Sequence, residues 1–166
     1  MTQDAARASQ RRLPVVAILE DIRSLYNVGS IFRTSDGAHI EKLITVGYTP
    51  HPPRKEIEKT ALGATETVPH EHFATIEEAV ASLRGFRIAA LEIAANSRSV
   101  FELTREDFPL ALIIGNEITG VSDRALALCD MAIEIPMLGA KHSLNVAVAY
   151  GIAIFECMRV VGGKQA

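Results

Sequence analysis

The sequence predicts an α/β fold, in which a mostly parallel sheet is covered by helices on both faces. Short apolar segments with strand character alternate along the chain with segments of helical character. The central strand segments lack polar alternation, as expected for parallel strands that are buried on both faces. The chain has 166 residues, which is the size of a single domain with a substantial core.

Five segments are expected to form the main strands. Each is short, largely apolar and followed by charged residues, glycine or proline. They are residues 14–19, 42–48, 86–93, 110–114 and 131–135. Residues 67–73 are expected to be irregular or to form a small strand, and residues 94–108 to be mostly loop with one helical turn at most.

Helices are expected between these strands, and capping residues indicate where they begin. Asn27, Ser122 and Ser143 are each expected to cap a helix, and Thr75 forms a capping box with Glu78. Glycines follow several of the segments, including Gly63 after the second. The expected helices cover residues 27–37, 55–62, 75–84, 122–128 and 143–161.

Composition and charge exclude several classes of protein. Hydrophobic residues make up 48% of the chain and charged residues 22%, which excludes disordered, collagen-like and disulfide-stabilised miniproteins. The net charge of −3 excludes a uniformly basic surface. Residues 1–60 carry a balance of +2 and residues 61–166 a balance of −5. An anionic partner is therefore expected on the N-terminal third.

The termini and cysteines indicate a cytoplasmic protein. Residues 1–13 are expected to be a loose tail without the apolar core of a secretory signal, followed by one domain over residues 14–166. No apolar segment reaches the roughly 18 residues of a membrane span. Cys129 and Cys157 lie in apolar helical contexts, so we expect buried thiols rather than a disulfide or a metal site.

Polar residues gather in three of the loops that follow predicted strands. Ligands of parallel sheets bind beyond the carboxyl ends of the strands, so these loops are the candidate site. The first contains Asn27, Gly29 and Arg33. The second and third are residues 115–120 (GNEITG) and 136–146 (PMLGAKHSLNV), where main-chain amides at a helix start could hold an adenine or a carboxylate.

Other well-known site patterns are missing from the sequence. It contains no GxGxxG, Walker A, HExxH or GxSxG motif. Its histidines lack the cysteine or acidic partners of a metal site, so no metal is expected. His51 and His142 lie on the ligand side of the predicted sheet, where they are either solvated or in contact with substrate.

Together, the three loops resemble the motifs of the SpoU (TrmH-type) branch of the SPOUT RNA methyltransferases. The resemblance extends from residue 14 to about residue 161. Its motifs are Asn27-x-Gly29-x-x-x-Arg33-Thr34, then Ile113-Ile114-Gly115-Asn116-Glu117 with Gly120, then Ile135-Pro136-Met137 and Ser143-Leu144-Asn145-Val146 with Ala149 and Gly151. Each motif alone is weak, whereas three in this order at predicted strand ends are specific.

The resemblance implies a chain topology, a cofactor and an oligomeric state that the hydrophobic periodicity of the sequence cannot reveal. It implies a C-terminal trefoil knot, which holds S-adenosylmethionine (AdoMet), and a homodimer with its active site near the subunit interface. Much of the cofactor contact would come from the main chain. The implied AdoMet-binding residues are Leu91, Glu92, Ile93, Gly115, Asn116, Glu117, Gly120, Ile135, Pro136, Met137, Ser143, Leu144 and Asn145.

The reaction implied by the resemblance is methyl transfer to a ribose 2′-hydroxyl of RNA, with tRNA and rRNA both open as substrates. Arg33 matches the arginine to which the family's catalysis is attributed. Two roles remain open for Arg33. It could accept the hydroxyl proton itself, although arginine is a poor base, or it could orient an RNA phosphate that accepts the proton. The resemblance gives Asn27 and Asn145 an orienting role, Glu117 a contact with Arg33 or substrate, and Ser143 a role in its loop.

RNA would have to be captured by the catalytic domain itself. Candidate contacts are Arg11, Arg12, Arg23, Arg54 and Lys55, which would form a composite basic groove across a dimer. The sequence departs from the family pattern at Gly37, where alanine is common, and this lowers helix stability by about 1 kcal/mol.

Two other hypotheses remain open from the sequence. The first is a non-catalytic protein of the same fold that binds RNA or AdoMet, which the acidic pI of about 6.0 favours. The second is a nucleotide-binding enzyme of unrelated chemistry on a plain, unknotted sheet.

Overall fold

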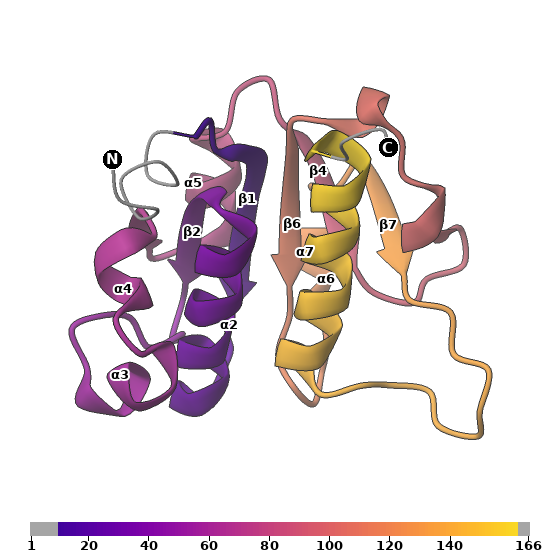
Figure 1. The fold of residues 1–166 in the computed structure, drawn as a ribbon. Coiled ribbons are helices and arrows are strands. Elements are labelled where there is room, and N and C mark those ends of the chain that lie inside the picture. The colour runs from indigo at the N-terminus through magenta and orange to yellow at the C-terminus, as the bar shows by residue number, and fades with distance from the viewer. Residues whose placement is uncertain (1–9, 163–166) are drawn as a thin grey trace.

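The computed structural model describes residues 10–162. They form a seven-stranded sheet in the order β3-β2-β1-β6-β4-β7-β5, and every pair of neighbouring strands is parallel. Figure 1 shows the sheet behind two long helices. The strands are β1 (Leu13–Glu20), β2 (Ile40–Val46), β3 (His70–Phe73), β4 (Arg87–Leu91), β5 (Arg98–Ser99), β6 (Leu110–Ile114) and β7 (Met131–Glu134).

The two central strands explain why the apolar segments show no polar alternation. In β1, Val15, Ala17 and Leu19 pack into the core on one face of the sheet, while Val16 and Ile18 pack into the core on the other. The five residues of β6 are likewise all buried. Because both faces are covered, residues 15–19 of β1 and all of β6 carry apolar side chains.

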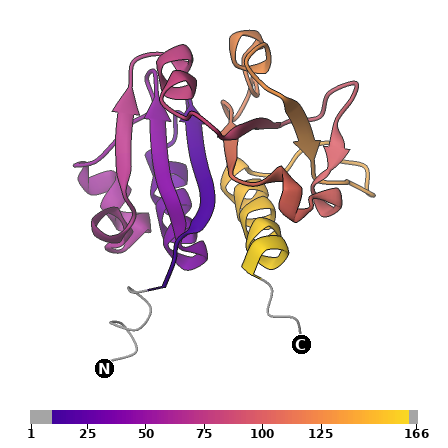
Figure 2. The same cartoon turned by 90° about the horizontal axis from the view of Figure 1, so that it is seen from above.

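The helices form one layer on each face of the sheet. α2 and α7 lie on one face and α5 and α6 on the other, as the view from above shows (Figure 2). α3 and α4 extend the first layer beside α2. The helices are α2 (Leu25–Ala38), α3 (Lys55–Ala61), α4 (Ala64–Thr67), α5 (Ile76–Ala81), α6 (Asp123–Leu126) and α7 (Val146–Gly162), and two 3₁₀ turns cover Val100–Glu102 and Arg105–Asp107.

A buried hydrogen bond joins α2 to α7. The hydroxyls of Ser35 and Tyr150 lie 2.6 Å apart, and both side chains are fully buried. Burial raises the pKa of the Tyr150 phenol, which keeps it neutral. The first and last helices of the described chain are therefore held together on one face of the sheet.

The structure corrects the expected starts of two helices. α2 begins at Leu25, and its cap is Ser24, whose Oγ accepts a hydrogen bond from the amide of Asn27. Asn27 therefore lies in the first turn rather than at the cap. α7 begins at Val146, and its cap is Asn145 rather than Ser143, because the Asn145 Oδ1 accepts the amides two and three residues later. The Thr75 and Ser122 caps are confirmed.

Other boundaries differ from the expected ones by a few residues. Residues 12 and 13 do not belong to a loose tail, contrary to expectation, because Leu13 is buried in β1 and the Arg12 guanidinium donates to the carbonyls of Ile40 and Thr67. Residues 1–9 lie outside the described residues. The loop expected over residues 94–108 contains the short edge strand β5 and both 3₁₀ turns. α3 ends at Ala61, and its C-cap is Leu62, itself in the left-handed region with φ 50°, rather than Gly63.

Both cysteines are free thiols, as expected. Cys157 is fully buried and Cys129 is half-buried. Burial raises the pKa of Cys129 to about 11 and that of Cys157 to about 12. Among residues 10–162, no helix has the length and apolar character needed to cross a membrane.

Candidate functional site

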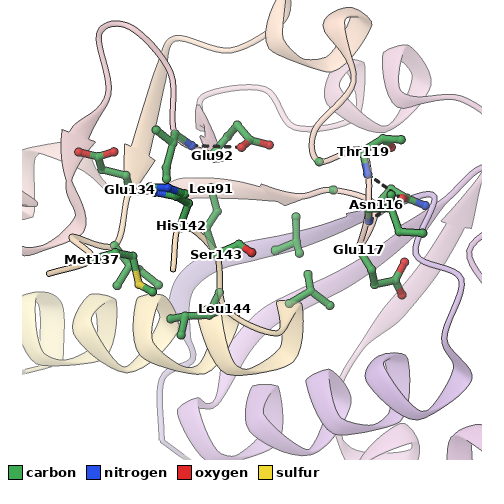
Figure 3. A pocket seen from close by; sticks show the side chains of 18 residues that line it. Leu91, Glu92, Asn116, Glu117, Thr119, Glu134, Met137, His142, Ser143 and Leu144 are labelled. Atoms are coloured by element: carbon green, nitrogen blue, oxygen red, sulfur yellow. Dashed lines mark hydrogen bonds between the residues drawn. The ribbon is translucent and has the colours of Figure 1, made fainter. Parts of the chain in front are cut away.

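A cavity of about 270 Å³ lies at the carboxyl ends of β4, β6 and β7 (Figure 3). Three segments enclose it, namely the loop after β4, the loop after β6, and the segment that leads from β7 into α7. The cavity is where parallel sheets bind their ligands. Its lining residues are Leu91, Glu92, Ile93, Ile114, Gly115, Asn116, Glu117, Ile118, Thr119, Gly120, Glu134, Ile135, Met137, His142, Ser143, Leu144, Val146 and Ala149.

Two glycines allow the loop after β6 to fold tightly at the edge of this cavity. Asn116 and Gly120 exchange both main-chain hydrogen bonds, at 3.1 and 2.9 Å. A Cβ on Gly115 would collide with the main chain of Gly120, and Gly120 itself adopts φ +72°. The Glu92 carboxylate packs against Gly120 and accepts the amide of Val121 at 2.9 Å, which attaches this loop to β4.

The Asn116 side chain connects three loops. Its Nδ2 donates to the carbonyl of Asp21 and to the hydroxyl of Tyr48, both at 2.9 Å. Its Oδ1 accepts the amides of Ile118 and Thr119 at 2.8 and 3.0 Å. Both ends of the amide are thus used, so Asn116 joins the loops that follow β1, β2 and β6.

Glu117 connects the same loop to the start of α2. Its carboxylate accepts the amides of Arg23 and Ser24 at 3.0–3.1 Å and the Nδ2 of Asn27 at 3.4 Å. Burial acts to raise the pKa of Glu117, but these hydrogen bonds outweigh it and hold the pKa below its usual value. Glu117 is therefore ionised at neutral pH, at the positive end of the α2 dipole.

The start of α7 approaches the same group of residues. Asn145 caps α7 through its Oδ1, while its Nδ2 lies 3.5 Å from the Asn27 Oδ1. Ser143 lines the cavity and, among the described residues, makes no side-chain hydrogen bond. Asn27, Glu117 and Asn145, which lie far apart in the sequence, are therefore brought together.

Arg33 lies outside this cluster. It is exposed on α2, two turns beyond Asn27, and it is not among the residues that line the cavity. Within residues 10–162 its guanidinium forms no hydrogen bond and no ion pair. The structure therefore leaves Arg33 free to contact a molecule bound over α2.

The arginines and lysine expected to bind RNA are distributed over three places. Arg11 and Arg12 border a groove at the start of β1. Arg23 follows the other end of that strand, which spans roughly 25 Å. Arg54 pairs with Glu56 at 3.5 Å beside Lys55, the first residue of α3. These residues do not form one groove within a protomer.

Eleven of the thirteen residues expected at the AdoMet site line the cavity, and Pro136 and Asn145 do not. Ile118 and Thr119, inside the predicted 115–120 loop, and Glu134, just before the third motif, also line the cavity although none was named as an AdoMet contact. Each of these adjoins a motif residue, so extending the motifs by a few positions would have found them. His142 also lines the cavity, whereas His51 stacks against His72 with ring centroids 4.2 Å apart.

Comparison with known proteins shows which proteins this chain is similar to in sequence. The 23S rRNA (guanosine-2′-O-)-methyltransferase RlmB of Pectobacterium atrosepticum is 30% identical over 151 residues, which cover 91% of this chain and 62% of that protein. The chain thus spans about three-fifths of the length of the curated relatives it matches.

Solved structures agree with the sequence comparison. An AdoMet-bound rRNA methyltransferase from Sinorhizobium meliloti superposes with a TM-score of 0.83 and 27% identity, covering 91% of this chain and 58% of that one. A structure described in terms of 2-OH methylation of C/U34 on tRNA superposes with a TM-score of 0.79 and 25% identity, covering 90% and 97% of the two chains. The model of the SpoU rRNA Methylase family matches residues 14–155, and the chain belongs to this family.

Proposed function

We propose that this protein transfers a methyl group from AdoMet to a ribose 2′-hydroxyl of RNA, as a single catalytic domain over residues 14–166. The observation that carries the proposal is the link between the cavity and α2. The loop that walls the cavity is attached by Glu117 to the start of α2, and α2 carries Arg33, whose guanidinium pairs with no residue of the described range. AdoMet in the cavity and an RNA held by Arg33 would then be bound by two connected elements, the loop after β6 and α2.

The residues of the cavity fit AdoMet by size and by charge. Its volume of about 270 Å³ is close to the lower end of the roughly 300–1,000 Å³ of ligand pockets. Leu91, Ile135 and Leu144 supply apolar walls that suit an adenine ring. Among the residues that the structure describes, three carboxylates line the cavity and no lysine or arginine does, which suits a positively charged sulfonium.

Main-chain groups of the β7–α7 segment are also available. Between residues 137 and 144, no amide donates a hydrogen bond to another described residue. These donors suit the ring nitrogens of adenine or the carboxylate of the methionine moiety. When bound, AdoMet would supply the electrophilic methyl group, and Pro136 and Asn145 would shape the segment rather than touch the cofactor.

We assign the remaining steps to residues on and beside α2. In the reaction the ribose oxygen gains a methyl group and its hydroxyl proton must leave. Arg33 would orient an RNA phosphate bidentately, and that phosphate would accept the proton. The start of α2 would be held against the cavity by Asn27, Glu117 and Asn145. Ser143 would help to position the segment before α7.

The wider assembly is part of the proposal. A stripe of exposed apolar residues on α7, formed by Val148, Ile152, Phe155 and Met158, would be covered by a second copy, giving a homodimer. The C-terminal segment would form the trefoil knot that the sequence resemblance implies, which agrees with β7 lying beyond β4 while α7 returns to α2 and β1. RNA in the cytoplasm, rRNA or tRNA, would be the substrate.

An Arg33→Ala variant tests the proposal. We expect methyl transfer to bulk RNA, prepared from cells without the gene, to fall at least a hundredfold, while AdoMet affinity by calorimetry stays within about threefold. The matched control is Arg84→Ala, which removes another exposed arginine and should leave transfer unchanged. Full transfer by Arg33→Ala would remove Arg33 from the mechanism. AdoMet binding by the wild type without transfer to any RNA would favour a non-catalytic binding protein.

A further inference from the structure

A second hollow of about 600 Å³ adjoins the methyl-donor cavity. Asn116, Ile118 and Thr119 line both spaces. Arg23 and Tyr48 complete the lining of the hollow. A molecule in the hollow would therefore lie directly beside one in the cavity.

Tyr48 presents an aromatic ring to this hollow from a well-defined position. Its side chain is 60% exposed, although its hydroxyl accepts a hydrogen bond from the Asn116 Nδ2. The turn that carries it is also restrained, because the Tyr48 amide donates to the Asp21 carboxylate at 3.2 Å. An exposed aromatic ring held at both ends loses little further freedom when a planar group stacks on it.

Arg23 supplies positive charge to the hollow that Tyr48 also lines. Its main chain is held by Glu117, which accepts its amide at 3.1 Å. Its side chain is exposed, and within residues 10–162 the guanidinium forms no ion pair. An aromatic ring and an unpaired arginine flanking one space match the base and the phosphate of a nucleotide.

We infer that this hollow receives the target nucleotide, with its base stacked on Tyr48 and a flanking phosphate bound by Arg23. The inference rests on the proposed function and adds to it a residue that determines substrate binding. Stacking on an aromatic ring tolerates any base, so Tyr48 positions the nucleotide and leaves base selection to other contacts. Asn116 links the two spaces, since the same side chain holds Tyr48 and shapes the cavity loop.

The absence of tryptophan from the sequence provides a direct test of stacking. A Tyr48→Trp variant would carry a single indole at the proposed stacking position. We expect its fluorescence to be quenched saturably by bulk RNA from cells without the gene. The control is Phe101→Trp, which places an indole at a similarly exposed site (55%) on the 3₁₀ turn after β5, and which should show only the absorbance of the added RNA.

Kinetics supply the second readout. We expect Tyr48→Ala to lower kcat/KM for RNA by about 5- to 150-fold, the range for loss of one stacked base, while its AdoMet affinity stays within threefold. Tyr48→Phe, which keeps the ring and loses the hydrogen bond to Asn116, should stay within about fivefold of the wild type.

The outcomes separate this inference from the proposed function. An unquenched Tyr48→Trp protein that still methylates RNA would overturn the stacking inference and leave the function standing. Quenching without methyl transfer, by the variant and the wild type alike, would support a nucleotide in the hollow and contradict the proposed reaction. Equal quenching of both tryptophan variants would also overturn the inference.

Discussion

Two carboxylates, Glu117 and Asp107, both accept hydrogen bonds from main-chain amides, but one connects the candidate site and the other stabilises the fold. Glu117 accepts main-chain amides at the start of α2 and connects the cavity to that helix. Asp107, only 3% exposed, accepts the guanidinium groups of Arg87 and Arg98 and the amide of Thr104. Burial acts to raise the pKa of Asp107, but the hydrogen bond from Arg98, the Thr104 amide and both positive charges outweigh it, so the pKa is lowered.

We expect Asp107→Asn to lower the free energy of unfolding by roughly 2–3 kcal/mol at pH 7, because two arginines lose their shared partner. A carboxylate with a lowered pKa stabilises the folded state above its ordinary pKa of 3.8 and loses this effect as the pH falls below it. Urea unfolding should therefore show the difference between wild type and variant narrowing below about pH 3.8.

Glu77→Gln is the matched control, because Glu77 pairs with Arg124 on the surface. Exposed pairs contribute little to stability because solvent screens them, so this change should have a small effect at every pH. A difference between wild type and Asp107→Asn that stays constant down to pH 2 would contradict the ionic role of Asp107.

At the scale of elements, the central sheet was predictable, whereas the starts of α2 and α7 were not. The β6 segment LALII clearly predicts a strand, because five consecutive apolar residues before glycine suit a strand buried on both faces. Ser24 and Asn27, by contrast, are both good caps, and so are Ser143 and Asn145. Only the three-dimensional path of the chain decides between them. β5 was missed because Arg98 and Ser99 are polar and pair with β7 alone.

The loops around the cavity could be predicted from the sequence, because their motifs stand at strand ends. The individual residues expected at the AdoMet site came from the family resemblance, and most of them line the cavity. The contact between Glu117 and the amides of Arg23 and Ser24 joins residues more than 90 positions apart, and no local pattern carries that information. Tyr48 escaped notice because a tyrosine after a strand is ordinary until its exposure is known.

The assignment of the α7 cap can be tested by a matched pair of variants. We expect Asn145→Ala to lower the free energy of unfolding by about 1 kcal/mol, through loss of its hydrogen bonds to the amides of Ala147 and Val148. Ser143→Ala should change it by less than about 0.5 kcal/mol. Urea unfolding followed by circular dichroism measures both, and a larger effect for Ser143→Ala would return the cap to that residue.

At the scale of the whole molecule, one long helix has two different faces. Tyr150, Ile154 and Cys157 of α7 are buried against the sheet and α2, while Val148 and Phe155 are exposed. An uncovered apolar stripe of this kind is typical of an interface. A dimer would also reconcile the net charge of −3 with RNA binding, because two copies would bring separate groups of arginines together.

We expect the wild type to have twice the 18.0 kDa mass of one chain in light scattering, and Phe155→Glu to have the mass of a monomer. The variant should be a monomer because burying the introduced carboxylate in an apolar interface would cost free energy. Leu62→Glu, at the exposed apolar residue that follows α3 away from the stripe, should leave the mass unaltered. A Phe155→Glu protein that keeps the dimer mass would place the interface elsewhere.

Ribose methylation of RNA by the purified protein is the central claim, and mass spectrometry measures it most directly. Bulk RNA from cells without the gene would be incubated with the protein and AdoMet carrying a deuterated methyl group, then digested to nucleosides. We predict one 2′-O-methylnucleoside that carries the deuterated methyl with wild-type protein and is missing with Arg33→Ala. A methyl group found on a base, or no labelled nucleoside although AdoMet is bound, would contradict the account.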